Sequence, residues 1–137
     1  MIYFKEHPTL SGIKIPLGLG ALLALLIFII FGDVLSANWR ADDTQILAHA
    51  LRHDVLDNFF NPEVWHQLSP ANLTPWVVAS FEIDLFLFGL SPLGFYTHQL
   101  IAIFLVAIAC FMLLRLWLEP RFAIAAALIF MLGLPTT

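Results

Sequence analysis

The stretch Ile15–Gly32, IPLGLGALLALLIFIIFG, runs for eighteen residues without a charged side chain. As a helix rising about 1.5 Å per residue, it is about 27 Å long, close to the hydrocarbon thickness of a bilayer. A cleavable signal peptide is the alternative, because Ser36-Ala37-Asn38 follows the run. The apolar core of a signal peptide is shorter, about 7–15 residues. The stretch therefore predicts a first membrane-spanning helix over residues 15–35.

Two further apolar segments follow this first one. Leu93–Leu114 contains twenty-two uncharged residues and predicts a second span over residues 91–116. After a turn at residues 117–121, Phe122–Leu134 adds thirteen apolar residues, about 20 Å of helix. This length is short for a span. We expect a third span over residues 122–137, either truncated in this sequence or accommodated by a locally thinner bilayer.

The overall composition is typical of an integral membrane protein. Hydrophobic residues make up 61% of the sequence and charged residues 12%, against about 45–50% and about 25% in soluble domains. A soluble domain is therefore excluded, and the lipid bilayer is the expected partner. The predicted fold class is an all-α membrane protein with about three transmembrane helices, plus one or two amphipathic or interfacial helices in the first outward loop.

Basic residues predict the orientation, because they concentrate in cytoplasmic loops. Lys5 and Lys14 precede the first span, and Arg115 and Arg121 flank the turn after the second. Residues 1–14 and 117–121 are then cytoplasmic and residues 36–90 extracytoplasmic, as in a bacterial inner membrane. The segment 38–84 holds two arginines against seven acidic residues. No basic patch is present, which excludes a nucleic-acid partner.

The outward loop contains two segments with helical character. Apolar residues recur at helical spacing in Asp42–Leu56, which predicts an amphipathic helix capped by Asp42 or Asp43. Trp76–Leu90 is apolar but includes Glu82 and Asp84. Ionised acids are costly at the centre of a bilayer, at about 2.5–3.5 kcal/mol each. We therefore expect this second segment at the membrane surface or against other protein.

The adjacent carboxylates Asp42 and Asp43 are the strongest candidates for chemistry. They lie just after the first span, where a carboxylate can act as a general base or bind a divalent metal. A purely structural role as the N-terminal cap of a helix is favoured by position alone. A divalent metal is the only cofactor that these residues suggest, and none can be assigned.

Other polar residues give weaker signals. Glu82, Asp84 and His98 are candidates for interaction, with a cation on another chain as one option for the two acids and a pigment or haem as one option for His98. His49 and His53 share a helix face and match a zinc-binding spacing, but a solvated polar face is favoured. The single cysteine, Cys110, is interpreted as a small packing residue.

The order of these features resembles the start of the GT-C superfamily of polytopic membrane glycosyltransferases, which use lipid-phosphate sugar donors. The resemblance rests on the sequence after the first span, RADDTQIL at residues 40–47, on Leu73-Thr74-Pro75, and on FGLSPLGFYTHQ at residues 88–99. It implies that Asp42 or Asp43 is a catalytic base or metal ligand in the first outward loop. The chain covers only the first part of that family's fold, so no donor-phosphate site is implied within it.

Two functions therefore remain open. In the first, the chain is the N-terminal portion of a glycosyltransferase that takes a sugar from a polyprenyl-phosphate donor. In the second, it is a non-catalytic transmembrane subunit that packs on and stabilises a larger membrane complex, such as an energy-transducing one, with the acidic loop as an external contact. A small enzyme complete in itself is the least favoured reading.

Overall fold

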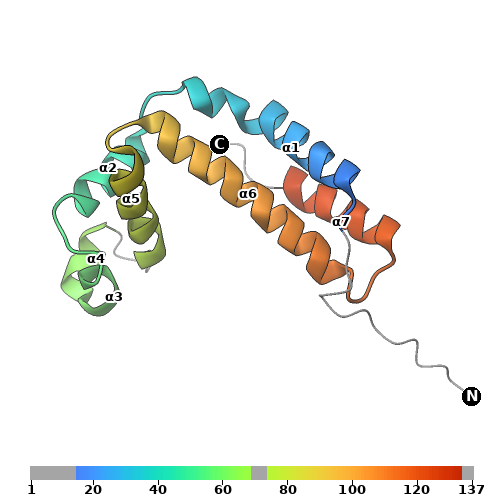
Figure 1. Cartoon of the computed structure of the whole chain (residues 1–137). Helices are drawn as coiled ribbons and strands as arrows, with labels where there is room; N and C mark the ends of the chain where they lie inside the picture. Colours follow the sequence, from blue (N-terminus) through green and yellow to red (C-terminus); the bar gives the residue numbers. More distant parts are fainter. Residues whose placement is uncertain (1–14, 69–73, 134–137) are drawn as a thin grey trace, which may run out of the picture. The chain divides into compact units, whose positions relative to one another are not determined.

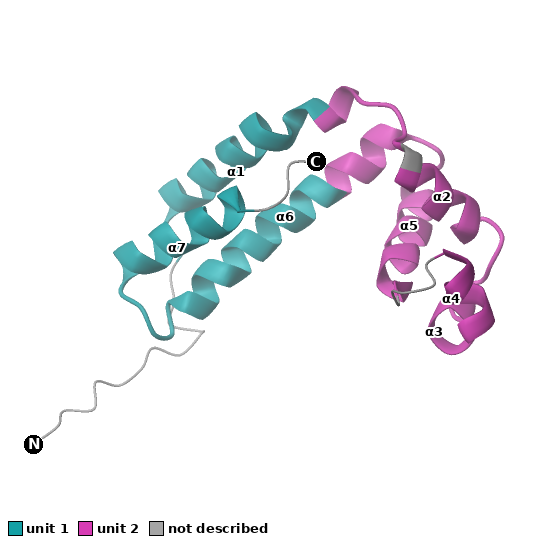
Figure 2. Ribbon diagram, turned by 180° about the vertical axis from the view of Figure 1, so that it is seen from behind, with its two compact units in different colours: residues 1–33, 99–137 teal, residues 34–98 magenta. Residues whose placement is uncertain are grey.

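The computed structural model describes residues 15–68 and 74–133. Within these ranges the chain is helical and contains no strand (Figure 1). It divides into two compact units, residues 34–98 and the remainder on either side of them (Figure 2). Each unit has its own hydrophobic core.

The first unit consists of α1 (Leu17–Phe31), the part of α6 (Pro92–Leu114) from Gln99 onward, and α7 (Pro120–Leu132). On each helix the buried residues recur at every fourth position, which places them on one stripe. The core consists of Leu19, Leu23, Ile27, Ala107, Phe111, Ala123, Ala127 and Met131. The predicted helices are confirmed, with ends that differ by a few residues from those expected.

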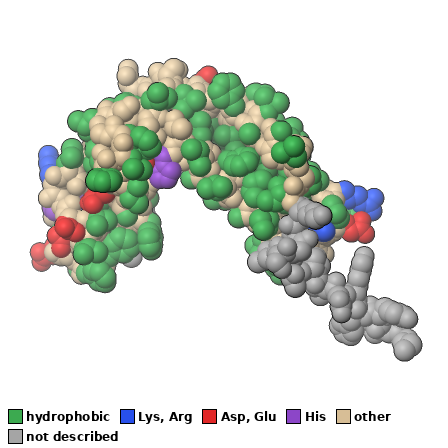
Figure 3. Space-filling view, in the orientation of Figure 1, with side chains coloured by type: hydrophobic (Ala, Val, Ile, Leu, Met, Phe, Trp, Pro, Cys, Tyr) green, Lys and Arg blue, Asp and Glu red, His purple; other side chains and the backbone are tan. Residues whose placement is uncertain are grey.

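Outside this core, the surface of the first unit is apolar. Leu17 is 90% exposed, and Phe28, Ile29 and Ile129 are also exposed. Hydrophobic side chains dominate the face shown in Figure 3. Helices that are apolar all round belong in lipid or in the core of a larger protein. Two helical segments, Leu17–Ser36 and Pro92–Leu114, are long and apolar enough to cross a membrane, which supports a membrane location by length and composition.

The second unit consists of α2 (Ala41–Ala50), α3 (Asp57–Phe60), α4 (Pro62–Leu68), α5 (Pro75–Phe88) and the start of α6. A 3-10 helix, η2 (Gly32–Ser36), follows α1 and leads into it. The core of the second unit consists of side chains from α2, α5 and α6, namely Leu47, Ala50, Val78, Phe81 and Phe95. The ring of Phe95 makes edge contacts with Trp39 at 4.9 Å and Phe81 at 5.3 Å between centroids. These aromatic contacts join α6 to α5 and to Trp39, which lies just before α2.

The helix predicted over Asp42–Leu56 is wrong at its C-terminal end, because α2 stops at Ala50. The backbone N–H of Leu56 donates to Asp54 Oδ1 at 2.8 Å. This local bond from an aspartate side chain to the backbone two residues on favours a turn over a helix. Asn61 makes the same kind of bond to the N–H of Glu63 and starts α4. Aspartate and asparagine therefore divide the segment that apolar spacing alone would join.

The turn between α5 and α6 depends on two glycines. Gly89 has a φ of 60°, in the left-handed region that favours glycine. Pro92 begins α6, where a missing N–H costs nothing. At Gly94 a Cβ atom would lie 2.3 Å from the ring of Phe88, so only glycine lets that ring pack against α6. The sequence FGLSPLG therefore forms the tight turn that joins α5 to α6.

The small residues of α7 provide a test of the first core. Ala127 is fully buried, whereas Ala125 on the same helix is exposed. We expect Ala127→Leu to destabilise the unit by about 1–3 kcal/mol, because the added carbons overpack a filled core. Ala125→Leu should leave stability nearly unchanged. Thermal unfolding in detergent, followed by helical circular dichroism, measures the difference, and equal effects of the two substitutions would contradict this core.

Candidate functional site

The two adjacent acids that follow α1, Asp42 and Asp43, have different environments. α2 begins at Ala41, so Asp42 and Asp43 are its second and third residues. Negative charge at these positions complements the positive end of the helix dipole. Asp43 Oδ2 accepts the backbone N–H of Arg40 at 3.2 Å, which ties the carboxylate to the start of the helix. The predicted capping role is thus filled by Asp43, from the third helical position.

Asp43 also connects α2 to α6. The Tyr96 hydroxyl donates to Asp43 Oδ2 at 2.7 Å and lies 3.2 Å from the carbonyl oxygen of Asn38. Tyr96 is only 4% exposed and Asp43 is half-buried, so this bond is partly shielded from water. Hydrogen bonds to a charged acceptor are stronger than neutral ones. Asp43 therefore stabilises the fold through these hydrogen bonds, and it is a poorer candidate for the catalytic carboxylate than Asp42.

Asp42 is exposed and makes no hydrogen bond or ion pair to any residue that the structure describes. Its backbone is fixed because the neighbouring Asp43 is anchored to Tyr96. A free carboxylate on a fixed backbone can accept a proton or contact a bound cation. Within residues 15–68 and 74–133, no three potential metal ligands gather, so the pair lacks a third ligand there for the divalent metal.

The second pair of acids lies on α5 and is divided as well. Glu82 and Asp84 are two residues apart and point in different directions, as their spacing indicates. Asp84 is 1% exposed, and its Oδ1 lies 2.6 Å from His98 Nδ1. Burial raises the pKa of Asp84, and the charge and hydrogen bond of His98 partly oppose that rise. The partner of Asp84 is thus a residue of this chain and need not come from another one.

Only one of the two nitrogen atoms of the His98 ring takes part in the hydrogen bond with Asp84. With Nδ1 bonded to Asp84, the other ring nitrogen, Nε2, takes no part in this bond, and the side chain is 38% exposed. A carboxylate behind a histidine fixes the orientation and tautomer of its ring. Such an arrangement can bind a ligand or accept a proton. A pigment or haem contact at His98 stays a prediction.

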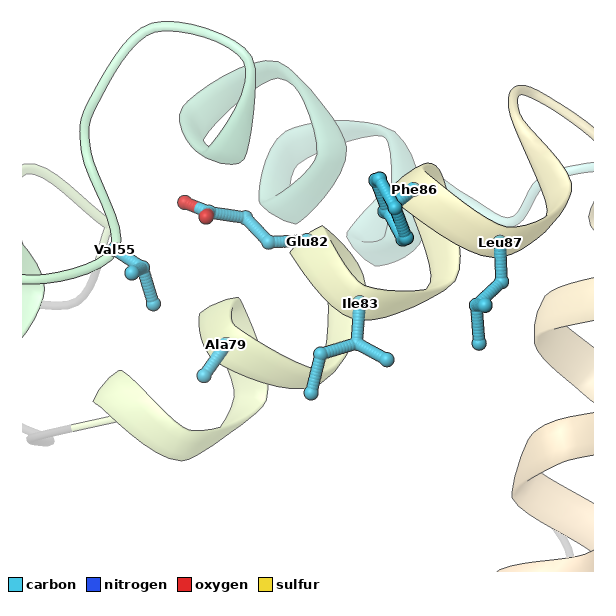
Figure 4. A pocket seen from close by; sticks show the side chains of 6 residues that line it. All are labelled: Val55, Ala79, Glu82, Ile83, Phe86 and Leu87. Atoms are coloured by element: carbon cyan, nitrogen blue, oxygen red, sulfur yellow. The ribbon is translucent and has the colours of Figure 1, made fainter.

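Glu82 lies at the edge of an apolar groove. The groove has a volume of about 370 Å³ and is lined by Val55, Ala79, Glu82, Ile83, Phe86 and Leu87 (Figure 4). Glu82 Oε1 is buried and has no hydrogen-bond partner among the described residues. Burial, together with the nearby carboxylate of Asp54, raises the pKa of Glu82.

The interpretation of His49 as part of a solvated face is wrong. His49 is buried, and its Nε2 lies 2.7 Å from Asn58 Oδ1. Asn58 is itself fully buried and donates to the carbonyl oxygen of Asp54 at 3.1 Å. The rings of His49 and His53 are 4.6 Å apart, but no third metal ligand joins them in the described ranges. The histidine therefore fastens α3 to α2.

Two residues of this region escaped the sequence reasoning, Tyr96 and Asn58. Both act across long or irregular stretches of chain, 53 residues from Tyr96 to Asp43 and nine from Asn58 to His49. The spacing of apolar residues carries no information on such pairs. The only signal available was that a tyrosine near the end of a span and an asparagine in an apolar setting each need a polar partner.

Removal of the Tyr96 hydroxyl tests the connection between α2 and α6. We expect Tyr96→Phe to cost about 1.5–3 kcal/mol, because Asp43 loses a partly shielded hydrogen bond. Thr97→Val deletes an exposed hydroxyl that bonds only to its own helix, at the carbonyl of Leu93, and should change stability by less than about 0.5 kcal/mol. Trp39, 6.4 Å from the Tyr96 ring, reports unfolding by fluorescence. Equal stability of the two variants would remove the anchoring role.

The environment of Glu82 predicts a pH dependence of stability. Because its pKa is raised from the usual 4.5, folding disfavours the charged form. The favourable contribution is complete below about pH 4.5 and is lost as the pH rises through the raised pKa. Glu82→Gln should therefore be more stable than the parent chain at pH 8 and about equal at pH 4.

The measurement is thermal unfolding in a lipid-free, non-ionic detergent across that pH range. Glu63→Gln is the control, because Glu63 is exposed. Its difference from the parent chain should not depend on pH. A Glu82→Gln difference that stays constant from pH 4 to pH 8 would show that Glu82 is not held in a disfavoured charged state.

Comparisons with known proteins found no relative of this chain. The chain matches no protein-family model, no curated protein and no solved structure. What it does is therefore inferred from its own residues.

Proposed function

We propose that this chain is the N-terminal membrane segment of a GT-C-type glycosyltransferase, with Asp42 as the catalytic base. The observation that carries the proposal is the different environment of the two adjacent acids. Asp43 is held by Tyr96 and by the start of α2, whereas Asp42 is exposed and free of described partners. An enzyme needs a base that is both accessible and well positioned.

The proposed reaction is the transfer of a sugar from a polyprenyl-phosphate donor with inversion. The Asp42 carboxylate accepts the proton of an acceptor hydroxyl, and the oxygen of that hydroxyl attacks the anomeric carbon of the donor sugar. The bond from that carbon to the phosphate oxygen breaks, and the lipid phosphate leaves with the electron pair. If a divalent metal takes part, Asp42 would be its ligand in this segment, and Asp43 could contribute only Oδ1, because its Oδ2 accepts from Tyr96 and Arg40.

The proposed topology places this carboxylate on the outer side of a bacterial inner membrane. The N-terminus and the turn before α7 are cytoplasmic, which fits Arg115 and Arg121 near that turn. Residues 36–90 are extracytoplasmic, with α2 and α5 as interfacial helices. α7 is the third span. It has thirteen residues, so we propose that the bilayer is locally thinner around it.

A second function is supported by one observation. The outer face of α5 is apolar, with Trp76 78% exposed and Phe86 88% exposed. A face of this kind suits a non-catalytic subunit that packs on a larger membrane complex. The mass of the natural gene product separates the two functions. A much longer polypeptide supports the glycosyltransferase, and a 15.4 kDa product that co-purifies with a large complex supports the subunit.

The catalytic assignment predicts separate effects for the two acids in the natural gene product. Asp42→Asn should lower sugar transfer by at least about 100-fold because the proton acceptor is lost. Its stability should fall by no more than about 1 kcal/mol, the contribution of one charge at the start of a helix. Asp43→Asn should lower stability as well, because it weakens the contact with Tyr96. Asp57→Asn, at an exposed acid of α3, is the control. Transfer from a polyprenyl-phosphate sugar is the measurement, and unchanged transfer in Asp42→Asn would remove Asp42 from the mechanism.

A further inference from the structure

The groove beside α5 combines an apolar wall with one carboxylate, Glu82, whose Oε1 atom is buried. Figure 4 shows the Glu82 side chain extending toward the segment that carries Val55, while Ala79 and Ile83 lie along the same helix. Apart from Glu82, the lining side chains are all hydrocarbon or aromatic. A ligand of this groove is therefore apolar along most of its length and polar at one point.

The polar point calls for a hydrogen-bond donor. Glu82 Oε1 is shielded from solvent and has no partner in the described parts of the chain. A buried carboxylate oxygen normally has at least one donor, since leaving it unpaired is costly. The nearby charged group that acts on it is Asp54, another acid. Two neighbouring carboxylates favour a donor that is also a cation.

The apolar part points to lipid. The groove opens on a face of α5 whose exposed residues include Trp76, Ile83, Phe86 and Leu87. An aromatic and aliphatic face of this kind is typical of helices that lie in the interface of a membrane. Because the same chain has two helices of membrane-spanning length, membrane lipid is the apolar material available to this face.

We propose that the groove binds a membrane lipid with a primary amine headgroup, an aminophospholipid of the phosphatidylethanolamine type. The ammonium donates to Glu82 and is further attracted by Asp54, and an acyl chain lies against Ile83, Phe86 and Leu87. The amine distinguishes this lipid from one with a quaternary headgroup, which carries the same charge but no N–H. The inference is independent of the proposed glycosyltransferase activity.

The test compares two lipids that differ only in whether the headgroup nitrogen carries three hydrogens or three methyl groups. The full chain is reconstituted in bilayer nanodiscs with equal amounts of phosphatidylethanolamine and phosphatidylcholine that have identical acyl chains. Lipids retained after release into mild detergent are then counted by native mass spectrometry. We expect the parent chain to retain phosphatidylethanolamine over phosphatidylcholine by about tenfold, the size of one charge-assisted hydrogen bond.

The variants locate that preference. Glu82→Gln preserves the shape of the side chain and should remove the preference, whereas Glu63→Gln, at an exposed acid, should keep it. Equal retention of the two lipids by the parent chain would overturn the proposal and leave a basic side chain of a protein partner as the occupant. A preference that survives in Glu82→Gln would overturn it too, because the amine would then bind elsewhere.

Discussion

The hydrogen bond between Tyr96 and Asp43 holds the start of α2 against the start of α6. It joins residues 53 positions apart and connects the first turn of α2 to the first turns of α6. The ring of Trp39 lies 6.4 Å from that of Tyr96 and contacts Phe95, so aromatic side chains pack on one side of the polar bond. In such surroundings the bond is both stronger and more costly to lose than at the surface. The accessible position of Asp42 follows from it, because the neighbouring residue is held in place.

Four acids of the second unit illustrate how position alone assigns different tasks to one chemical group. Asp43 is tied to a tyrosine, Asp84 to a histidine, Asp42 faces solvent, and Glu82 keeps a buried oxygen without a described partner. A carboxylate that is already bonded stabilises the fold and is poorly available for binding. The exposed acid and the unpartnered acid are therefore the two from which chemistry or binding is to be expected. They lie on different helices, and each supports a separate proposal.

The sequence predicted the helices well where one physical rule dominates. Long uncharged runs need only length and composition, so α1 and α6 were found with nearly correct ends. The end of α2 was missed because the side chain of Asp54 competes for the backbone, a local effect that apolar spacing cannot reveal. His49 was misjudged for a related reason. Its burial depends on Asn58, which lies outside the helix whose face was being read. The third span and the orientation stay predictions.

The candidate site was predictable only in part, and the resemblance to the glycosyltransferases shows why. The stretch from Phe88 to Gly94 is explained by the turn between two helices, since Gly89 needs its positive φ and Gly94 must accommodate the ring of Phe88. A turn with this backbone geometry favours glycine at these two positions, whatever the activity of the protein. This part of the resemblance therefore reports backbone geometry. The acids after the first span are different, because capping α2 requires one carboxylate and the chain supplies two. The functional part of the resemblance therefore rests on Asp42, whose side chain is exposed and makes no hydrogen bond to the described residues.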